Sequence, residues 1–175
     1  MTTSNQKRPL PSEYASYYDP YVKRVIDGDI CQILEGQLAR TQALLTKVGE
    51  ARAGHRYSPE KWSIREVVGH IIDAERIFAY RALCFARSEK KHLPGFDQDS
   101  FVQAANFERR TLSDLTTEFE LVRKSNVILF RSFPDEVWER RGVANNVEFT
   151  VRSIPYIIAG HELHHCSLLK ERYLI

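Results

Sequence analysis

The chain has 175 residues, which is one domain's length and enough to bury a core without disulfides. Its composition is 43% hydrophobic and 27% charged, which is ordinary for a globular protein. The 25 basic and 23 acidic residues balance to a formal charge of +2, which argues against a dedicated nucleic-acid binder with a concentrated basic surface. Three cysteines without a CxxC pair argue against a disulfide framework and fit a reducing compartment.

The N-terminal segment is polar and aromatic, without an apolar run of signal-peptide length. No stretch approaches the roughly 18 apolar residues that a membrane-spanning helix needs. We therefore expect a cytoplasmic protein with no membrane partner.

Residues 1–25 are predicted to be a leader that packs on the rest of the chain. Three prolines interrupt any continuous helix there. Four tyrosines in so short a segment favour packing over a loose tail. Residues 26–175 are then expected to form a single bundle domain.

The first two long helices are predicted over residues 29–48 and from Ser63 to about Arg87. Apolar residues recur at helical spacing in both segments, and Gly49 stands where the first helix would stop. Ser63 and Glu66 form a capping-box pattern, in which each side chain satisfies a backbone N–H of the other residue.

The second half of the chain predicts a short helix over residues 100–106 and long helices over 111–132 and 153–173. Residues 140–150 are expected to be irregular. Four long helices without a convincing strand predict an all-α four-helix bundle. The connections 88–111 and 133–152 exceed ordinary bundle loops, so we expect them to cross over the bundle.

Histidines are the most informative residues. His161 and His165 stand at i and i+4 in the apolar stripe of the last helix, where both can reach one metal ion. His70 stands at the edge of the stripe of the second long helix and would be a third ligand if the two helices pack together. Two interpretations stay open at this point, a metal site or core histidines that hydrogen bond to protein groups.

The remaining histidines are assigned less specific roles. His55 and His92 are in predicted loops and are expected to be ordinary surface residues. His164 is expected at the edge of the stripe, as a surface group or a group beside the ligands.

The chain resembles the DinB/YfiT-like superfamily of metal-binding four-helix bundles. The residues that carry the resemblance are KWSIREVVGHIIDAERIFAYRALCFAR, LPGFDQDSF and IIAGHELHHCSLLKERYL. It implies that the metal triad is His70, His161 and His165, that the metal is zinc or nickel, and that the protein is a homodimer. It also implies either S-transfer with a low-molecular-weight thiol or metal-dependent hydrolysis.

Candidate catalytic groups besides the metal are few. Arg81 shares the face of His70, and it would bind a substrate carboxylate or neutralise a core carboxylate. Glu162 points about 100° away from His161 and is expected at the surface or beside the ligands. Asp97 is in a loop that can reach the site, although a helix cap is the favoured role. Glu75 is expected in a surface or interhelical ion pair, and Cys166 is expected to be an inert thiol that misses the metal.

Three hypotheses follow from these residues. The first is a divalent-metal-dependent enzyme that activates a thiol or water and acts on a small-molecule substrate. The second is a non-catalytic stress-response protein that binds a metal and a small ligand. The third is a structural bundle whose histidines are satisfied core residues.

Overall fold

The computed structural model describes residues 7–173. Its four long helices are α2 (Ile30–Val48), α3 (Ile64–Ala86), α5 (Leu112–Arg131) and α6 (Ser153–Arg172). Two short helices, α1 (Asp19–Val22) and α4 (Gln98–Ala105), and one hairpin, β1 (Arg141–Ala144) with β2 (Val147–Thr150), complete the regular structure apart from short 3₁₀ turns. The predicted four-helix bundle is confirmed. None of the described helices combines the length and apolar character that a membrane crossing requires.

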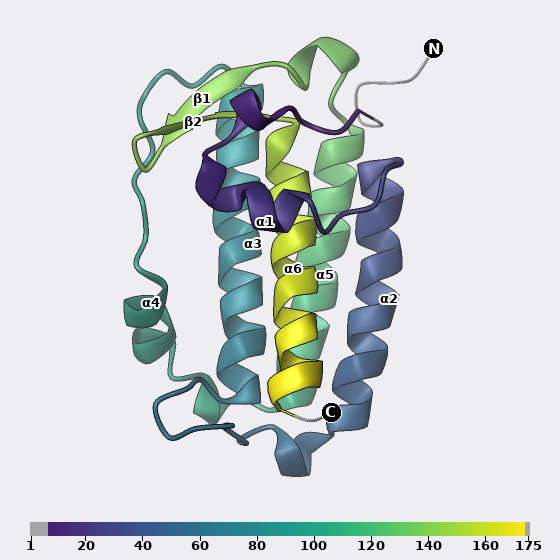
Figure 1. Cartoon of the computed structure of the whole chain (residues 1–175), viewed down its shortest axis with the longest axis vertical. Helices are drawn as coiled ribbons and strands as arrows, with labels where there is room; N and C mark the ends of the chain where they lie inside the picture. The colour runs from purple at the N-terminus through teal and green to yellow at the C-terminus, as the bar shows by residue number, and fades with distance from the viewer. Residues whose placement is uncertain (1–6, 174–175) are drawn as a thin grey trace.

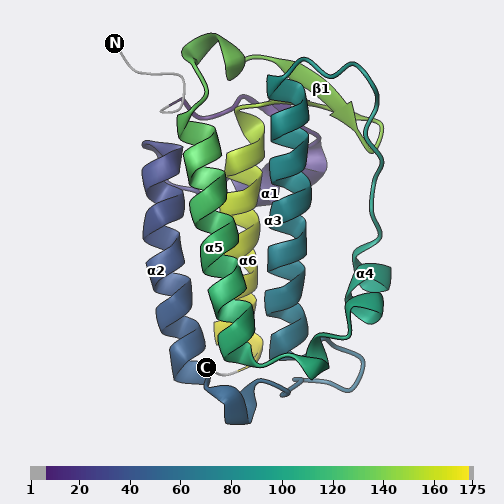
Figure 2. The same ribbon diagram turned by 180° about the vertical axis from the view of Figure 1, so that it is seen from behind.

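The helices are connected in an unusual order. α2 and α3 each pack mainly against α5 and α6, so these two consecutive helices occupy opposite corners of the bundle (Figures 1 and 2). The segment after α3 returns along the whole length of the bundle and carries α4 on its flank (Figure 1). This long connection makes α3 and α5 parallel, and it leaves α3 beside the antiparallel α6.

Helix ends follow local capping chemistry. At the start of α3, the backbone N–H of Ser63 donates to Glu66 Oε2 at 2.7 Å, and the N–H of Glu66 donates to Ser63 Oγ at 3.2 Å. The predicted capping box is therefore confirmed. α4 begins two residues earlier than predicted because Asp97 caps it, accepting from the N–H of Ser100 at 2.7 Å.

The hairpin corrects the expectation that residues 140–150 are irregular. β1 and β2 pair antiparallel, with Arg141 opposite Thr150 and Ala144 opposite Val147. Asn145 and Asn146 both have positive φ, at 51° and 59°, which suits the two-residue turn of a tight hairpin. Asparagine tolerates this left-handed conformation better than most residues do, and that property was overlooked in the sequence.

The described part of the leader, residues 7–25, lies across the bundle, and the first six residues of the predicted leader lie outside the described chain (Figure 1). Tyr14 and Val22 are buried. Glu13 joins the leader to the start of α6, because its carboxylate accepts from Arg152 at 2.7 and 3.0 Å and from Thr150 at 2.7 Å.

α1 crosses α6 at closest approach beside Gly160. A Cβ at Gly160 would lie 2.0 Å from the carbonyl oxygen of Tyr21, far inside van der Waals contact. Glycine is required there because only a residue without a side chain lets the two backbones meet. This contact places the leader directly over the residue that follows, His161.

We predict that Gly160→Ala destabilises the protein, because the methyl group forces the leader away from α6. The expected loss is about 1–3 kcal/mol in the free energy of unfolding, measured by urea titration. Gly36→Ala in α2 is the matched control, since a Cβ there meets its nearest neighbour at 3.4 Å. The control should be neutral or stabilising by up to about 1 kcal/mol. Equal stability of both variants would contradict this account of the crossing.

Candidate metal centre

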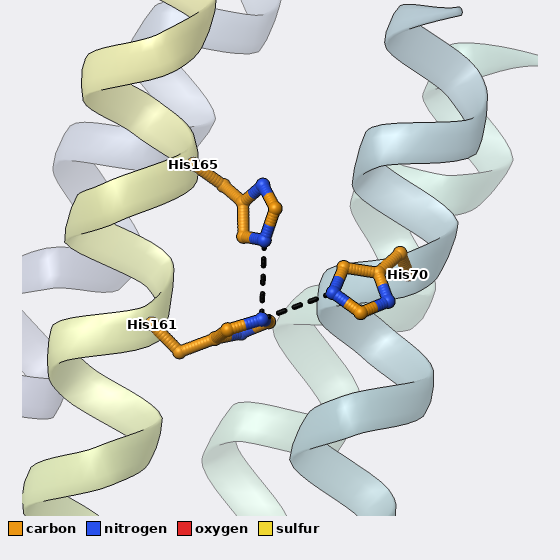
Figure 3. Close-up of side chains that lie close together, drawn as sticks. All are labelled: His70, His161 and His165. Atoms are coloured by element: carbon orange, nitrogen blue, oxygen red, sulfur yellow. Dashed lines mark hydrogen bonds between the residues drawn. The ribbon is translucent and has the colours of Figure 1, made fainter. Parts of the chain in front are cut away.

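Three histidines meet where α3 packs against α6. His70 comes from the second turn of α3, and His161 and His165 come from successive turns of α6 (Figure 3). The Nε2 atom of His161 lies 3.0 Å from Nε2 of His70 and 3.1 Å from Nε2 of His165. One ligand atom from each ring lies within 4.8 Å of the others. The structure thus brings together all three residues of the predicted triad.

Hydrogen bonds between the rings cannot account for this convergence. A neutral imidazole nitrogen carries either one proton or one in-plane lone pair, so Nε2 of His161 can make one well-directed bond. It has two imidazole nitrogens at bonding distance. A cation between the rings would accept a lone pair from each of them, so the donor set suits a divalent metal.

Burial keeps the three rings neutral at physiological pH. It lowers the pKa of His70 to about 4 and that of His165 to about 3, the latter with a further contribution from His70. Burial, with the neighbouring rings, also holds the pKa of His161 well below its usual range. Neutral imidazoles have the free lone pairs that metal binding needs, so the site has no proton to lose before it can bind.

Aromatic side chains pack around the triad. The ring of Trp62 lies 4.8 Å from that of His70, and the ring of Tyr21 lies 5.6 Å from that of His161. Nδ1 of His165 is buried and has no hydrogen-bond partner among the described residues. Packing, and not a hydrogen bond to Nδ1, therefore orients this ring.

A cleft of about 380 Å³ opens onto the triad. His70 and His161 form part of its lining, so the cluster is accessible from this side. The other walls come from the leader, the far half of α3, the loop before α4 with the first turn of α4, and the hairpin. They include Tyr17, Tyr18, Tyr21, Phe78, Arg81, Phe96, Asp97, Asp99 and Asn145. Several of these groups are polar, as expected for a site that positions a ligand.

The structure shows where the other candidate residues lie relative to the cleft. Arg81 and Asp97 both line the cleft, and Asp97 also has the predicted capping role. Cys166 contacts Thr41 at 3.3 Å, and burial raises the pKa of its thiol to about 11, which fits an inert group. His92 is exposed in its loop.

The two other histidines outside the triad lie beside tyrosine rings. The His164 ring packs 5.5 Å from that of Tyr21, at the edge of the site. His55 packs 6.1 Å from the ring of Tyr173, at the opposite end of α6.

Glu162 was expected either at the surface or beside the ligands, and the surface placement is wrong. Glu162 is 1% exposed and does not line the cleft; its carboxylate faces α2 and α5, where it accepts from the Thr41 hydroxyl and pairs with Arg123 at 2.7 Å. The reason is that α6 is enclosed by α1, α2 and α3, so a large angle from His161 does not lead to solvent. Burial raises the pKa of Glu162, and Arg123 and Thr41 only partly offset that effect.

Arg123 was not identified from the sequence, and its cation neutralises two buried carboxylates in the core. It is fully buried in α5, donates to both oxygens of Glu75 at 2.8 Å and also donates to the carbonyl of Leu34 at 3.0 Å. Arg123 thus holds the carboxylates of α3 and α6 together, and Glu75 takes the interhelical ion pair expected of it. The available signal was its position one turn from Phe119 and one turn from Val127 in the apolar stripe of α5.

We predict that Arg123→Met costs about 3–5 kcal/mol in the free energy of unfolding, because it leaves two carboxylates buried without their cation. Arg131→Met is the matched control, since Arg131 pairs with Glu35 on the surface. The control should cost less than about 1 kcal/mol in the same chemical denaturation experiment. A small loss in Arg123→Met would show that this buried network does not hold the bundle together.

The fold and the histidine cluster define a helical-bundle protein with a candidate metal centre. A family model described as the DinB superfamily matches residues 33–169, and the chain belongs to that superfamily.

Among solved structures, the chain is similar to YfiT from Bacillus subtilis, with a TM-score of 0.73 and 16% sequence identity. The match covers 97% of this chain and 93% of YfiT, which is described as a probable metal-dependent hydrolase with an unusual four-helix bundle topology. At this identity the likeness shows a shared fold. A comparison with curated proteins gives no significant match.

Proposed function

We propose that the chain is a divalent-metal-dependent enzyme whose cation, zinc or nickel, is held by His70, His161 and His165. The observation that carries the proposal is the convergence of three neutral imidazoles, in which Nε2 of His161 lies 3.0 Å from that of His70 and 3.1 Å from that of His165. Membership of the DinB superfamily and the description of YfiT support it. Three imidazoles leave a coordination position open, which is typical of catalytic sites and not of closed structural ones.

A divalent cation at this position would act as a Lewis acid that lowers the pKa of a water or thiol bound beside the cleft. The chain supplies the surroundings for this chemistry. The rings of Trp62 and Tyr21 pack against those of His70 and His161. Tyr18 and Tyr21 line the cleft with phenols whose pKa values are raised by burial, so they stay protonated as hydrogen-bond donors.

The groups that line the cleft favour thiol transfer over hydrolysis. Its carboxylates come from Asp97 and Asp99, and hydrogen bonding from the N–H of Ser100 lowers the pKa of Asp97. A lowered pKa makes Asp97 a poor proton acceptor. A thiol has an ordinary pKa of about 8.5 and water one of about 15.7, so thiol ionisation depends less on a base. We therefore propose S-transfer as the activity of this protein and keep hydrolysis as the alternative.

We expect untagged protein to bind about one metal ion per chain, measured by elemental analysis after dialysis. His70→Ala and His165→Ala should each weaken metal affinity by more than about 100-fold, since even groups behind the ligands contribute 10- to 100-fold. His92→Ala is the matched control because this imidazole is exposed in a loop, and it should bind as the unaltered protein does.

Turnover should depend on the same residues. Metal-loaded protein is to be assayed with low-molecular-weight thiols plus electrophiles and, separately, with ester and amide substrates. We expect thiol-dependent turnover that disappears in both triad variants. Metal binding without turnover in either assay would support the non-catalytic binding role. Absence of metal binding after reconstitution would indicate that the histidines are ordinary core residues and would contradict the enzyme proposal.

A further inference from the structure

We propose that Arg81 binds a carboxylate of the substrate, at the part of the cleft farther along α3 from the histidines. The inference rests on the proposed function, which places the reacting group of the substrate at the three histidines. It adds the substrate class, a small extended molecule with a thiol or hydrolysable group at one end and a carboxylate at the other.

In the described part of the chain, Arg81 is a buried cation without a carboxylate partner. The described chain buries three arginines, of which Arg123 pairs with Glu75 and Glu162, and Arg152 pairs with Glu13. Arg81 is 3% exposed, and no ion pair to a carboxylate is formed by it within residues 7–173. The alternative role expected from sequence, neutralising a core carboxylate, is taken by Arg123 instead.

Neutral groups fix the Arg81 side chain in place. Its Nη2 donates to the carbonyl of Pro94 at 3.1 Å, and the nearby Tyr18 phenol partly offsets the lowering of the Arg81 pKa by burial. The guanidinium lies over the Phe78 ring, 5.1 Å from the centroid. A guanidinium has five N–H groups, so these contacts leave donors free for an anion. Burying a charge with so little compensation is costly, and a bound anion would supply the missing partner.

Arg81 and the triad belong to one cleft. Arg81, His70 and His161 are all part of the same lining. Arg81 follows His70 by eleven residues on α3, which places both on one face of the helix, roughly 20° apart. Because helix side chains lean towards the N-terminus, the guanidinium returns to the level of Phe78. Phe78 is roughly 12 Å along the axis from His70, so the substrate must be extended to reach both groups.

The cleft favours a ligand group with one negative charge over a group with two. Asp97 and Asp99 line it beside Phe96, and their charges oppose a phosphate dianion more than a carboxylate monoanion. A carboxylate also matches the planar fork of a guanidinium with two parallel hydrogen bonds. These features select a carboxylate as the group recognised.

The test uses thiol probes on metal-loaded protein, with binding followed by the thiolate-to-metal absorption band of the nickel form. Mercaptooctanoate should bind about 10- to 100-fold more tightly than mercaptooctanol, the range expected for a hydrogen bond to a charged group. Mercaptoacetate is too short to span the cleft and should show little advantage over mercaptoethanol. Mercaptooctylphosphonate should bind more weakly than mercaptooctanoate.

Variants assign the preference to Arg81. Arg81→Gln should abolish the advantage of mercaptooctanoate over mercaptooctanol, and Arg81→Lys should retain part of it. Arg76→Gln is the matched control, because it removes one positive charge from the same helix, from a partly exposed ion pair with Glu118. The control should keep the full advantage. Metal content should be unchanged in all three variants, which separates this subsite from the triad.

A second measurement needs no metal. Octanoate should shift the guanidinium nitrogen resonance of Arg81 in metal-free protein, and octanol should not. The proposal is overturned if the carboxylate advantage is absent, persists in Arg81→Gln, is equal for short and long thiols, or if octanoate leaves the Arg81 resonance unmoved. Loss of metal binding alone would overturn the proposed function, while the octanoate result would still decide the role of Arg81.

Discussion

The contact between α3 and α6 is the constraint on which the candidate site depends. One imidazole comes from α3 and two come from α6, so their nitrogens meet only if these helices are neighbours (Figure 3). The long connection after α3 makes that possible, because it returns along the bundle and lets α5 run parallel to α3 (Figure 1). The leader then crosses α6 at Gly160 and places Tyr21 beside His161. Connectivity and close packing together form the cleft.

Buried charge divides the bundle into two regions with different roles. In the core, Arg123 meets Glu75 and Glu162, and these ion pairs join α3, α5 and α6 without reaching the cleft. At the cleft, no carboxylate of residues 7–173 pairs with the neutral imidazoles or with the cation of Arg81, whose Nη2 donates to the carbonyl of Pro94. Removing one partner of a buried ion pair destabilises the protein because it leaves a charge uncompensated, whereas buried groups that lack a partner are candidates for ligand binding. This contrast is the physical basis for assigning function to one region and structure to the other.

Local patterns predicted much of the fold, and context decided the rest. The capping box at Ser63, the stop at Gly49 and the i, i+4 histidine pair depend on neighbouring residues, so they were visible in the sequence. The hairpin was missed because two consecutive asparagines set a turn that apolar periodicity does not report. The placement of Glu162 failed because angles on one helix give no information on what covers its other face. The convergence of the triad needs the packing of distant helices, which only the family resemblance implied.

The central claim, that three imidazoles bind one cation, is tested most directly by X-ray absorption on zinc-loaded protein. We predict three imidazole nitrogens and an oxygen at about 2.0–2.1 Å from the metal, with the multiple-scattering pattern of histidine rings. Replacing His161 by glutamine should remove one of the three rings from that pattern. A sulfur shell at about 2.3 Å, which would indicate a cysteine ligand, or a metal without imidazole scattering would contradict the claim.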